Sequence, residues 1–125
     1  LHSSVDLMPT LLDLVDINIP ERVQGVSQAP VLRAQLNEVR HHVYAEYDES
    51  PPHHRIRFLR DHRYSFAYFS GLDFGMLFDM DADPQQQENL FTSPSHRNTV
   101  SHFYELLATS SIEFDSWLPA KISHA

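Results

Sequence analysis

A basic cluster lies between positions 53 and 63 of an otherwise acidic chain. The net charge is −8, yet four of the nine Lys and Arg residues fall in this short segment. Guanidinium and imidazole groups donate hydrogen bonds to oxyanions, so the cluster is a candidate site for an anionic ligand. Its members are His53, His54, Arg55, Arg57, Arg60, His62 and Arg63. The alternative is that the arginines are solvated strand residues that pair with Asp48, Glu49 or Asp61.

Three carboxylates form a second candidate, because the spacing of Asp79, Asp81 and Asp83 is similar to that of the first ligands of a calcium loop. The segment lacks the Gly and the distal bidentate Glu that such a loop needs. A turn followed by a helix cap is therefore the favoured interpretation.

A short helix is predicted directly after these carboxylates. Asp83 fits the N-cap, and Pro84 at the first helical position has no N–H to leave unsatisfied. Gln86 can reach back as in a capping box. Asn89 tolerates the left-handed conformation that ends such a turn.

The nine histidines suggest metal binding, but their spacing argues against a site made of histidine alone. His41 and His42 are neighbours on a predicted strand and point to opposite faces. His96 and His102 are six positions apart on a predicted helix, which misses the i, i+4 spacing of paired ligands. We therefore assign no metal ligand within the chain.

Length and composition limit what the chain can do. A length of 125 residues, 42% of them hydrophobic, suits one small domain with a real core. The negative charge gives no footprint for nucleic acid or an anionic membrane, and no apolar run approaches about 18 residues. The absence of cysteine excludes disulfides. A start at Leu1 without Met suggests an excised piece of a longer protein.

The first third predicts a helix and a long loop. Asp6 can cap a helix that runs to about Asp16, whose apolar face carries Leu7, Leu11, Leu14 and Val15. Positions 18–30 form a loop interrupted by Pro20 and Gly25, and only a short helix over 31–36 is plausible after it.

The middle of the chain predicts an antiparallel sheet, because short connections join four segments with strand patterns. The expected strands are Val39 to Tyr47, Ile56 to Arg60, Arg63 to Phe69 and Phe74 to Met80. A helix from Ser95 or His96 to Ser110 should cover one face, with Val100, Phe103, Tyr104 and Leu107 at helical spacing. The other face also carries apolar residues and needs a second partner.

Several segments together resemble the C-terminal part of sulfatases, which are relatives of alkaline phosphatase. They keep the order of that family over nearly the whole chain. The segments are Ser4 to Leu14, Ile19-Pro20, Val23 to Ser27, Arg57 to Tyr64 and Leu77 to Leu90.

The resemblance implies an α+β fold with two parts. Residues 1–37 would be a helix-loop remnant of the large α/β sulfatase domain. Residues 38–125 would be the C-terminal subdomain, with its four-stranded antiparallel sheet packed on the C-terminal helix. The missing large domain would cover the second face of the sheet.

The resemblance also implies the function. The chain would be the C-terminal portion of a sulfatase, catalytically incomplete alone, supporting the large domain and closing one side of the substrate cleft. The alternative is a non-catalytic binding or assembly module related to that subdomain. A Cys/Ser-x-Pro-x-Arg motif upstream of Leu1 in the parent reading frame would distinguish the two.

Sulfatases use a formylglycine nucleophile and a divalent cation, so formylglycine and calcium are implied for the full-length parent. This chain has no Cys, and we assign no catalytic residue in it. The most similar segment, Thr92 to Arg97, fails because Thr92 holds the nucleophile position and His96 the Arg position.

The remaining implications concern ligands and partners. The loop between the first two strands can face the cleft in sulfatases, which makes His53, His54 and Arg55 candidates for binding a sulfated small molecule or glycan. Whether the ester is a sulfate, a phosphonate or a phosphate stays open. Without its large domain the chain should form homo-oligomers through Leu7, Leu11 and Leu14.

Overall fold

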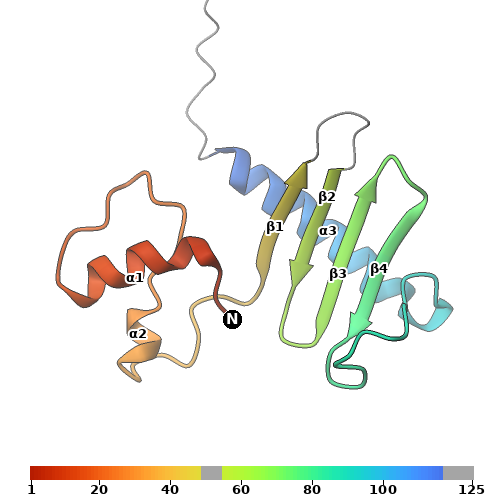
Figure 1. The fold of residues 1–125 in the computed structure, drawn as a ribbon, viewed down its shortest axis with the longest axis horizontal. Helices are drawn as coiled ribbons and strands as arrows, with labels where there is room; N and C mark the ends of the chain where they lie inside the picture. The colour runs from red at the N-terminus through yellow and green to blue at the C-terminus, as the bar shows by residue number, and fades with distance from the viewer. Residues whose placement is uncertain (49–54, 117–125) are drawn as a thin grey trace, which may run out of the picture.

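The computed structural model describes residues 1–48 and 55–116 and shows an α+β fold, as predicted (Figure 1). Helices α1 and α2 lie together beside the sheet, and we call residues 1–37 the helix-loop unit and the described residues from 38 onward the sheet unit. The elements are η1 (Ser4–Asp6), α1 (Leu7–Leu14), α2 (Ala29–Leu32), β1 (Val43–Asp48), β2 (Arg55–Arg60), β3 (Tyr64–Ser70), β4 (Phe74–Asp79), η2 (Pro94–His96) and α3 (Arg97–Ser116). Within the described residues, no helix combines the length and apolarity needed to cross a membrane.

The four strands pair antiparallel in the order β1-β2-β3-β4, which confirms the predicted sheet. Apart from the start of β1, each strand begins and ends within one residue of its predicted boundary. The larger difference is that β1 begins at Val43 rather than Val39, because Val43 pairs with Arg60, where β2 ends, and the preceding residues have no strand residue opposite them. Between β2 and β3, the Asp61 carboxylate accepts hydrogen bonds from the Arg63 and Tyr64 N–H groups, which closes the tight hairpin.

The core lies between the sheet and α3. One residue from each of the three strands β2, β3 and β4 forms a buried row, in which Leu59 is opposite Phe66 and Phe66 is opposite Leu77. Phe103 of α3 packs on this row and stacks on Phe66 with ring centroids 5.3 Å apart. The predicted C-terminal helix therefore covers one face of the sheet, as expected.

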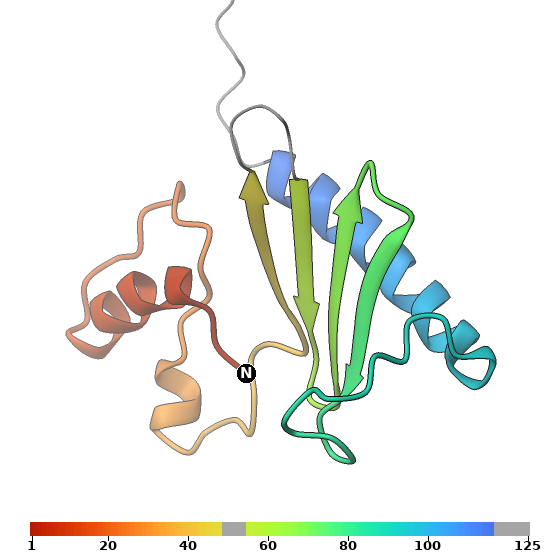
Figure 2. The same ribbon diagram turned by 45° about the vertical axis from the view of Figure 1, so that its right-hand side comes forward.

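The other face of the sheet has no covering helix among the described residues. Figures 1 and 2 show α3 behind the sheet, while α1 and α2 lie beside the β1 edge. The aromatic side chains of Tyr47, Phe58 and Phe74 point to this open face and are 51%, 39% and 43% exposed. Exposed aromatic groups on one sheet face are typical of an interaction surface.

The helix-loop unit differs from the prediction in detail. A 3-10 turn, η1, precedes α1, which ends at Leu14. Helix α2 begins earlier than expected, because Pro30 suits its first turn, and it ends before Ala34, which has a φ of 56°. The leucines of α1 lie on the surface, so α1 does not fold back over the open sheet face; Leu7, Leu11 and Leu14 are 64%, 55% and 39% exposed.

The helix predicted after Asp83 is wrong, because the segment is a series of turns. The Asp83 carboxylate accepts the Glu88 N–H at 2.8 Å instead of capping a helix, and Gln86 rather than Asn89 has a positive φ, 56°. Asn89 has a different role. Its side chain accepts the Leu77 N–H and donates to the Gly75 carbonyl, each at 3.0 Å. These bonds satisfy backbone groups of the edge strand β4 and fix the loop against it.

Candidate functional site

The candidate site begins at the end of the sheet where β2 starts. Arg55 is the first residue of β2, is exposed, and lies in register with Asp48 of β1 and Ser70 of β3. His53 and His54 lie outside the described residues. Arg55 is therefore the one predicted contact residue that the structure places, and it sits at the base of the connection that carries the two histidines.

A polar network supports this end of the sheet. The Arg57 guanidinium binds the Asp48 carboxylate at 2.6 Å and the Glu46 carboxylate at 3.2 Å. The Tyr44 hydroxyl donates to Glu46 and contacts the Ser111 hydroxyl of α3 at 3.0 Å. The network thus joins β2, β1 and α3 close to Arg55.

The charges of this network stabilise one another. The hydrogen bond from Arg57 lowers the pKa of Asp48, and the same bond raises the pKa of Arg57. Since its charge is compensated and its side chain is only 19% exposed, Arg57 holds β1 to β2 rather than offering a free cation to a ligand. For Arg57, the alternative of a strand residue paired with Asp48 is correct.

The other members of the basic cluster lie elsewhere. Arg60 points to the open face, since its position alternates with those of Arg57 and Leu59. At the opposite end of the sheet, Arg63 binds Asp79 at 2.7 Å and His62 contacts Glu38 at 2.6 Å. The cluster that is continuous in sequence is therefore divided between two ends and two faces of the sheet.

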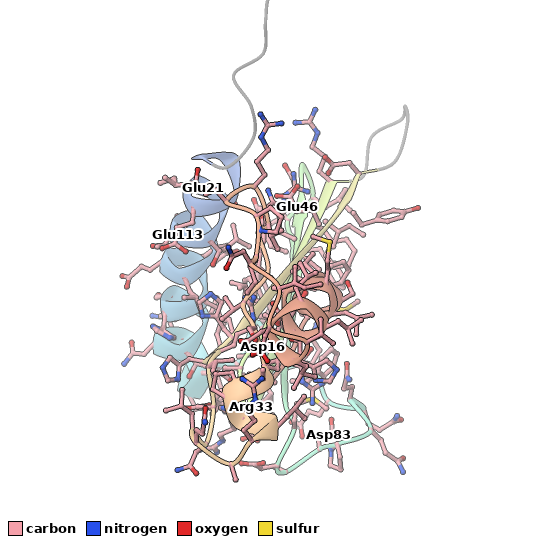
Figure 3. The ribbon with its side chains drawn as sticks, turned by 90° about the vertical axis from the view of Figure 1, so that its left-hand side faces the viewer. Asp16, Glu21, Arg33, Glu46, Asp83 and Glu113 are labelled. Atoms are coloured by element: carbon pink, nitrogen blue, oxygen red, sulfur yellow. The ribbon has the colours of Figure 1, made fainter. Side chains whose placement is uncertain are left out.

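The carboxylate series at positions 79–83 forms a turn. One oxygen of the buried Asp79 accepts from Arg63, and the other accepts the N–H groups of Asp81 and Ala82. The bond from Arg63 lowers the pKa of Asp79. Figure 3 shows Asp83 low in the molecule and Glu46 high, so this turn is remote from the polar network that includes Glu46. In the described part of the chain, no group of three or more His, Asp or Glu side chains is placed to hold a metal ion.

Asp6 is the residue whose role the sequence did not indicate. It stands at the N-cap position of α1, as predicted, but its side chain does not cap that helix. The carboxylate is 2% exposed and accepts from the Ser3 and Val26 N–H groups, from the Gln28 amide and from the Arg40 guanidinium. Burial alone would raise the pKa of Asp6, but the bonds from Arg40, Val26 and Ser3 together lower it. Asp6 therefore joins two segments of the helix-loop unit, the N-terminal turn and the loop at Val26 and Gln28, to the segment that enters β1.

Together these features define a small α+β subdomain. Helix α3 covers one face of its sheet, the other face is open, and a polar network stabilises the end of the sheet at Arg55. Comparison with known proteins gives the family. Residues 1–113 match the family model described as N-sulphoglucosamine sulphohydrolase, C-terminal. The chain therefore belongs to this family of sulfatase C-terminal regions, which confirms the resemblance.

Individual relatives agree with this family. The chain is 31% identical to the delta 4,5-hexuronate-2-O-sulfatase of Bacteroides thetaiotaomicron over 83% of its own length and 22% of the relative. A solved structure of a 2-O GAG sulfatase aligns with a TM-score of 0.79 at 28% identity, covering 90% of this chain and 25% of that one. The phosphonate monoester hydrolase of Silicibacter pomeroyi, at 24% identity and a TM-score of 0.76 over 98% of this chain and 26% of that one, shares the fold. The chain thus spans about a fifth to a quarter of each of these three proteins.

The buried carboxylate Asp6 leads to a pH prediction. Because its folded pKa is below the unfolded value near 3.9, its contribution to stability is complete above about pH 4 and is lost as the pH falls through the folded pKa. Asp6→Asn should lower the free energy of unfolding near neutral pH by roughly 3 kcal/mol and flatten its decline in acid. Chemical denaturation of the protein between pH 3 and pH 7 measures both effects.

Asp16→Asn is the matched control, because Asp16 is an exposed carboxylate of the same unit that makes none of these contacts. We expect its acid limb to follow that of the wild type. An Asp6→Asn variant with the same pH dependence as the wild type would contradict the assignment.

Proposed function

We propose that the chain is the C-terminal portion of a sulfatase, and that its parent hydrolyses sulfuric esters. The observation that carries this proposal is the family match over residues 1–113, to a region that makes up about a fifth of much longer sulfatases. The alternative of a non-catalytic assembly module is less favoured, because the matched relatives with named activities include several sulfatases. The chain alone is then an incomplete enzyme.

The surface of the chain supports a structural role beside a larger domain. The open sheet face and the exposed leucines of α1 are two apolar areas that burial would stabilise by about 25 cal/mol per Å². In our proposal the large domain covers both, residues 1–37 belong to that domain, and the sheet unit closes one side of its substrate cleft. Where that domain is absent, we expect the chain to form homo-oligomers that bury the same leucines.

The reactive groups would come from the preceding part of the parent. A formylglycine needs a Cys or Ser in the motif of the family, and this chain has neither a Cys nor that motif. Of the carboxylates that resemble a calcium loop, Asp79 is engaged by Arg63 and by two backbone N–H groups, and Asp83 accepts the Glu88 N–H. We therefore place both formylglycine and calcium in the preceding part of the parent.

The substrate class follows from the names of the relatives. They include a hexuronate-2-O-sulfatase and an N-acetylglucosamine-6-O-sulfatase, and one similar structure is described in complex with its substrate D-glucosamine-2-N,6-O-disulfate. We propose a sulfated sugar, with a sulfated small molecule as the second candidate because a choline-sulfatase is also similar. In either case His53, His54 and Arg55 would contact the anionic substrate from the supported end of the sheet.

The first test is activity. We expect the full-length parent to carry a Cys/Ser-x-Pro-x-Arg motif before Leu1 and to release sulfate from sulfated sugars or an aryl sulfate. The purified 125-residue chain should show no turnover above background in the same assay with calcium. Turnover by the chain alone, or a parent without the motif and without activity, would overturn the proposal.

The second test concerns substrate contact. In the parent, His53→Ala, His54→Ala and Arg55→Ala should each lower kcat/KM by roughly tenfold to a hundredfold, since losing a hydrogen bond to a charged group costs about 1.5–3 kcal/mol. His62→Ala is the matched control, because it removes an exposed imidazole at the other end of the sheet. Wild-type kinetics for the first three variants, or an equal loss for His62→Ala, would remove the assignment.

A further inference from the structure

The junction between the helix-loop unit and the sheet unit is incompletely filled. A half-open cavity of about 260 Å³ separates them, with Ser3 and Val26 on one side and His42, Tyr44 and Ser110 on the other. The cavity is open to solvent and its lining mixes polar with apolar groups, so no continuous apolar contact closes it. Apolar packing across the cavity therefore does not fix the angle between the two units.

The Asp6–Arg40 pair crosses this junction. The Arg40 Nε lies 3.0 Å from one oxygen of Asp6, and the Nη2 lies 2.5 Å from the other. Such a two-point contact of a planar guanidinium with a planar carboxylate restricts orientation as well as distance. Asp6 is 2% exposed and Arg40 is 21% exposed, so solvent and salt screen the attraction of this pair only in part.

Both partners of the pair are held on their own side. In the helix-loop unit, the Asp6 carboxylate is fixed by the Ser3 N–H at 2.8 Å, the Val26 N–H at 2.9 Å and the Gln28 amide at 3.3 Å. Arg40 comes three residues before β1, which begins at Val43. A rotation of the helix-loop unit would therefore break the pair or move the start of β1.

The connecting segment has a second attachment two residues further on. The His42 Nε2 lies 3.1 Å from the Ser110 hydroxyl of α3, and Ser110 is buried. Arg40 is thus attached to the helix-loop unit and His42 to the sheet unit. The short segment between them leaves little freedom for the units to change their relative direction.

We propose that the Asp6–Arg40 pair is a positioning contact that sets the orientation of the helix-loop unit relative to the sheet unit. On the proposed function, where residues 1–37 belong to the large domain, the pair also sets where the Arg55 end of the sheet lies against the substrate cleft. This second consequence rests on the proposed function, whereas the first does not.

A second ion pair provides a matched control. Arg33 binds Asp13 at 3.0 Å through one guanidinium nitrogen and the Asp13 carbonyl at 3.0 Å through another. Both residues belong to the helix-loop unit, and Figure 3 shows Arg33 at the end of α2, within that unit. Removing Arg33 therefore breaks a carboxylate–guanidinium pair without touching the junction.

The experiment measures the distance between the two units in the full-length protein. Spin labels are attached to Cys introduced at Glu21 and Ser101, which are exposed positions on opposite sides of the junction. This chain has no Cys of its own, and any Cys in the rest of the parent is first replaced by Ser. We expect one narrow distance distribution for the wild type and for Arg33→Gln. Arg40→Gln and Asp6→Asn should both give a broader or shifted distribution, and combining them should add nothing further.

A merely stabilising role is distinguished by the same readout. It would lower the melting temperature of Arg40→Gln and leave the distribution unchanged, which would overturn the proposal. If Arg40→Gln does not fold, Arg40→Lys is measured instead, because it keeps the charge and loses the two-point geometry. A broadened distance distribution for Arg40→Lys supports the proposal, and an unchanged distribution overturns it. The distances do not depend on turnover, so a parent without sulfatase activity would contradict the proposed function and leave this test valid.

Discussion

The stacked contact between Phe66 of β3 and Phe103 of α3 is the interaction on which the sheet unit depends. The two rings lie 18° from parallel, and Leu59 and Leu77 are buried on either side of Phe66 in the neighbouring strands. This arrangement places the best-packed part of the chain on one face of the sheet. A single helix cannot cover both faces, so the aromatic side chains of the other face remain for a partner.

Polar contacts connect parts of the chain that apolar packing does not hold together. The Arg57 network connects β2, β1 and α3 near Arg55, and Asp6 connects the helix-loop unit to the segment that enters β1. Each of these contacts has defined geometry, and removing one partner would leave a charged or polar group without compensation. The chain therefore combines a small core with charged contacts at the places where its parts meet.

Much of the fold could be predicted from the sequence. The alternation of apolar residues in β3 and β4, the short connections between strands and the helical spacing around Phe103 are local patterns, and they gave the sheet and α3. The prediction of a helix after Asp83 was wrong because a cap residue followed by Pro can begin either a helix or a turn. Which of the two forms depends on the bonds between Asn89 and β4, which is distant in the sequence. Local rules do not contain such contacts.

The site was less accessible to sequence reasoning for the same reason. The basic cluster is continuous in the chain, yet alternation along β2 and the hairpin at Asp61 separate its members. The partners of Asp6 include Val26 and Arg40, which lie 20 and 34 positions away, so no local signal marks its role. Recognition of the family required the order of several weak segments over the whole chain.

We propose that a larger domain of the same protein covers the open face of the sheet. Hydroxyl-radical footprinting of the full-length protein tests it by comparing Tyr47, Phe58 and Phe74 with Tyr104, which lies on α3 at the other side and is 38% exposed. In the chain by itself all four rings are accessible to a similar extent. We predict that in the full-length protein the three sheet residues are oxidised much more slowly than Tyr104. Comparable oxidation rates for all four would show that the face stays open and would contradict the account.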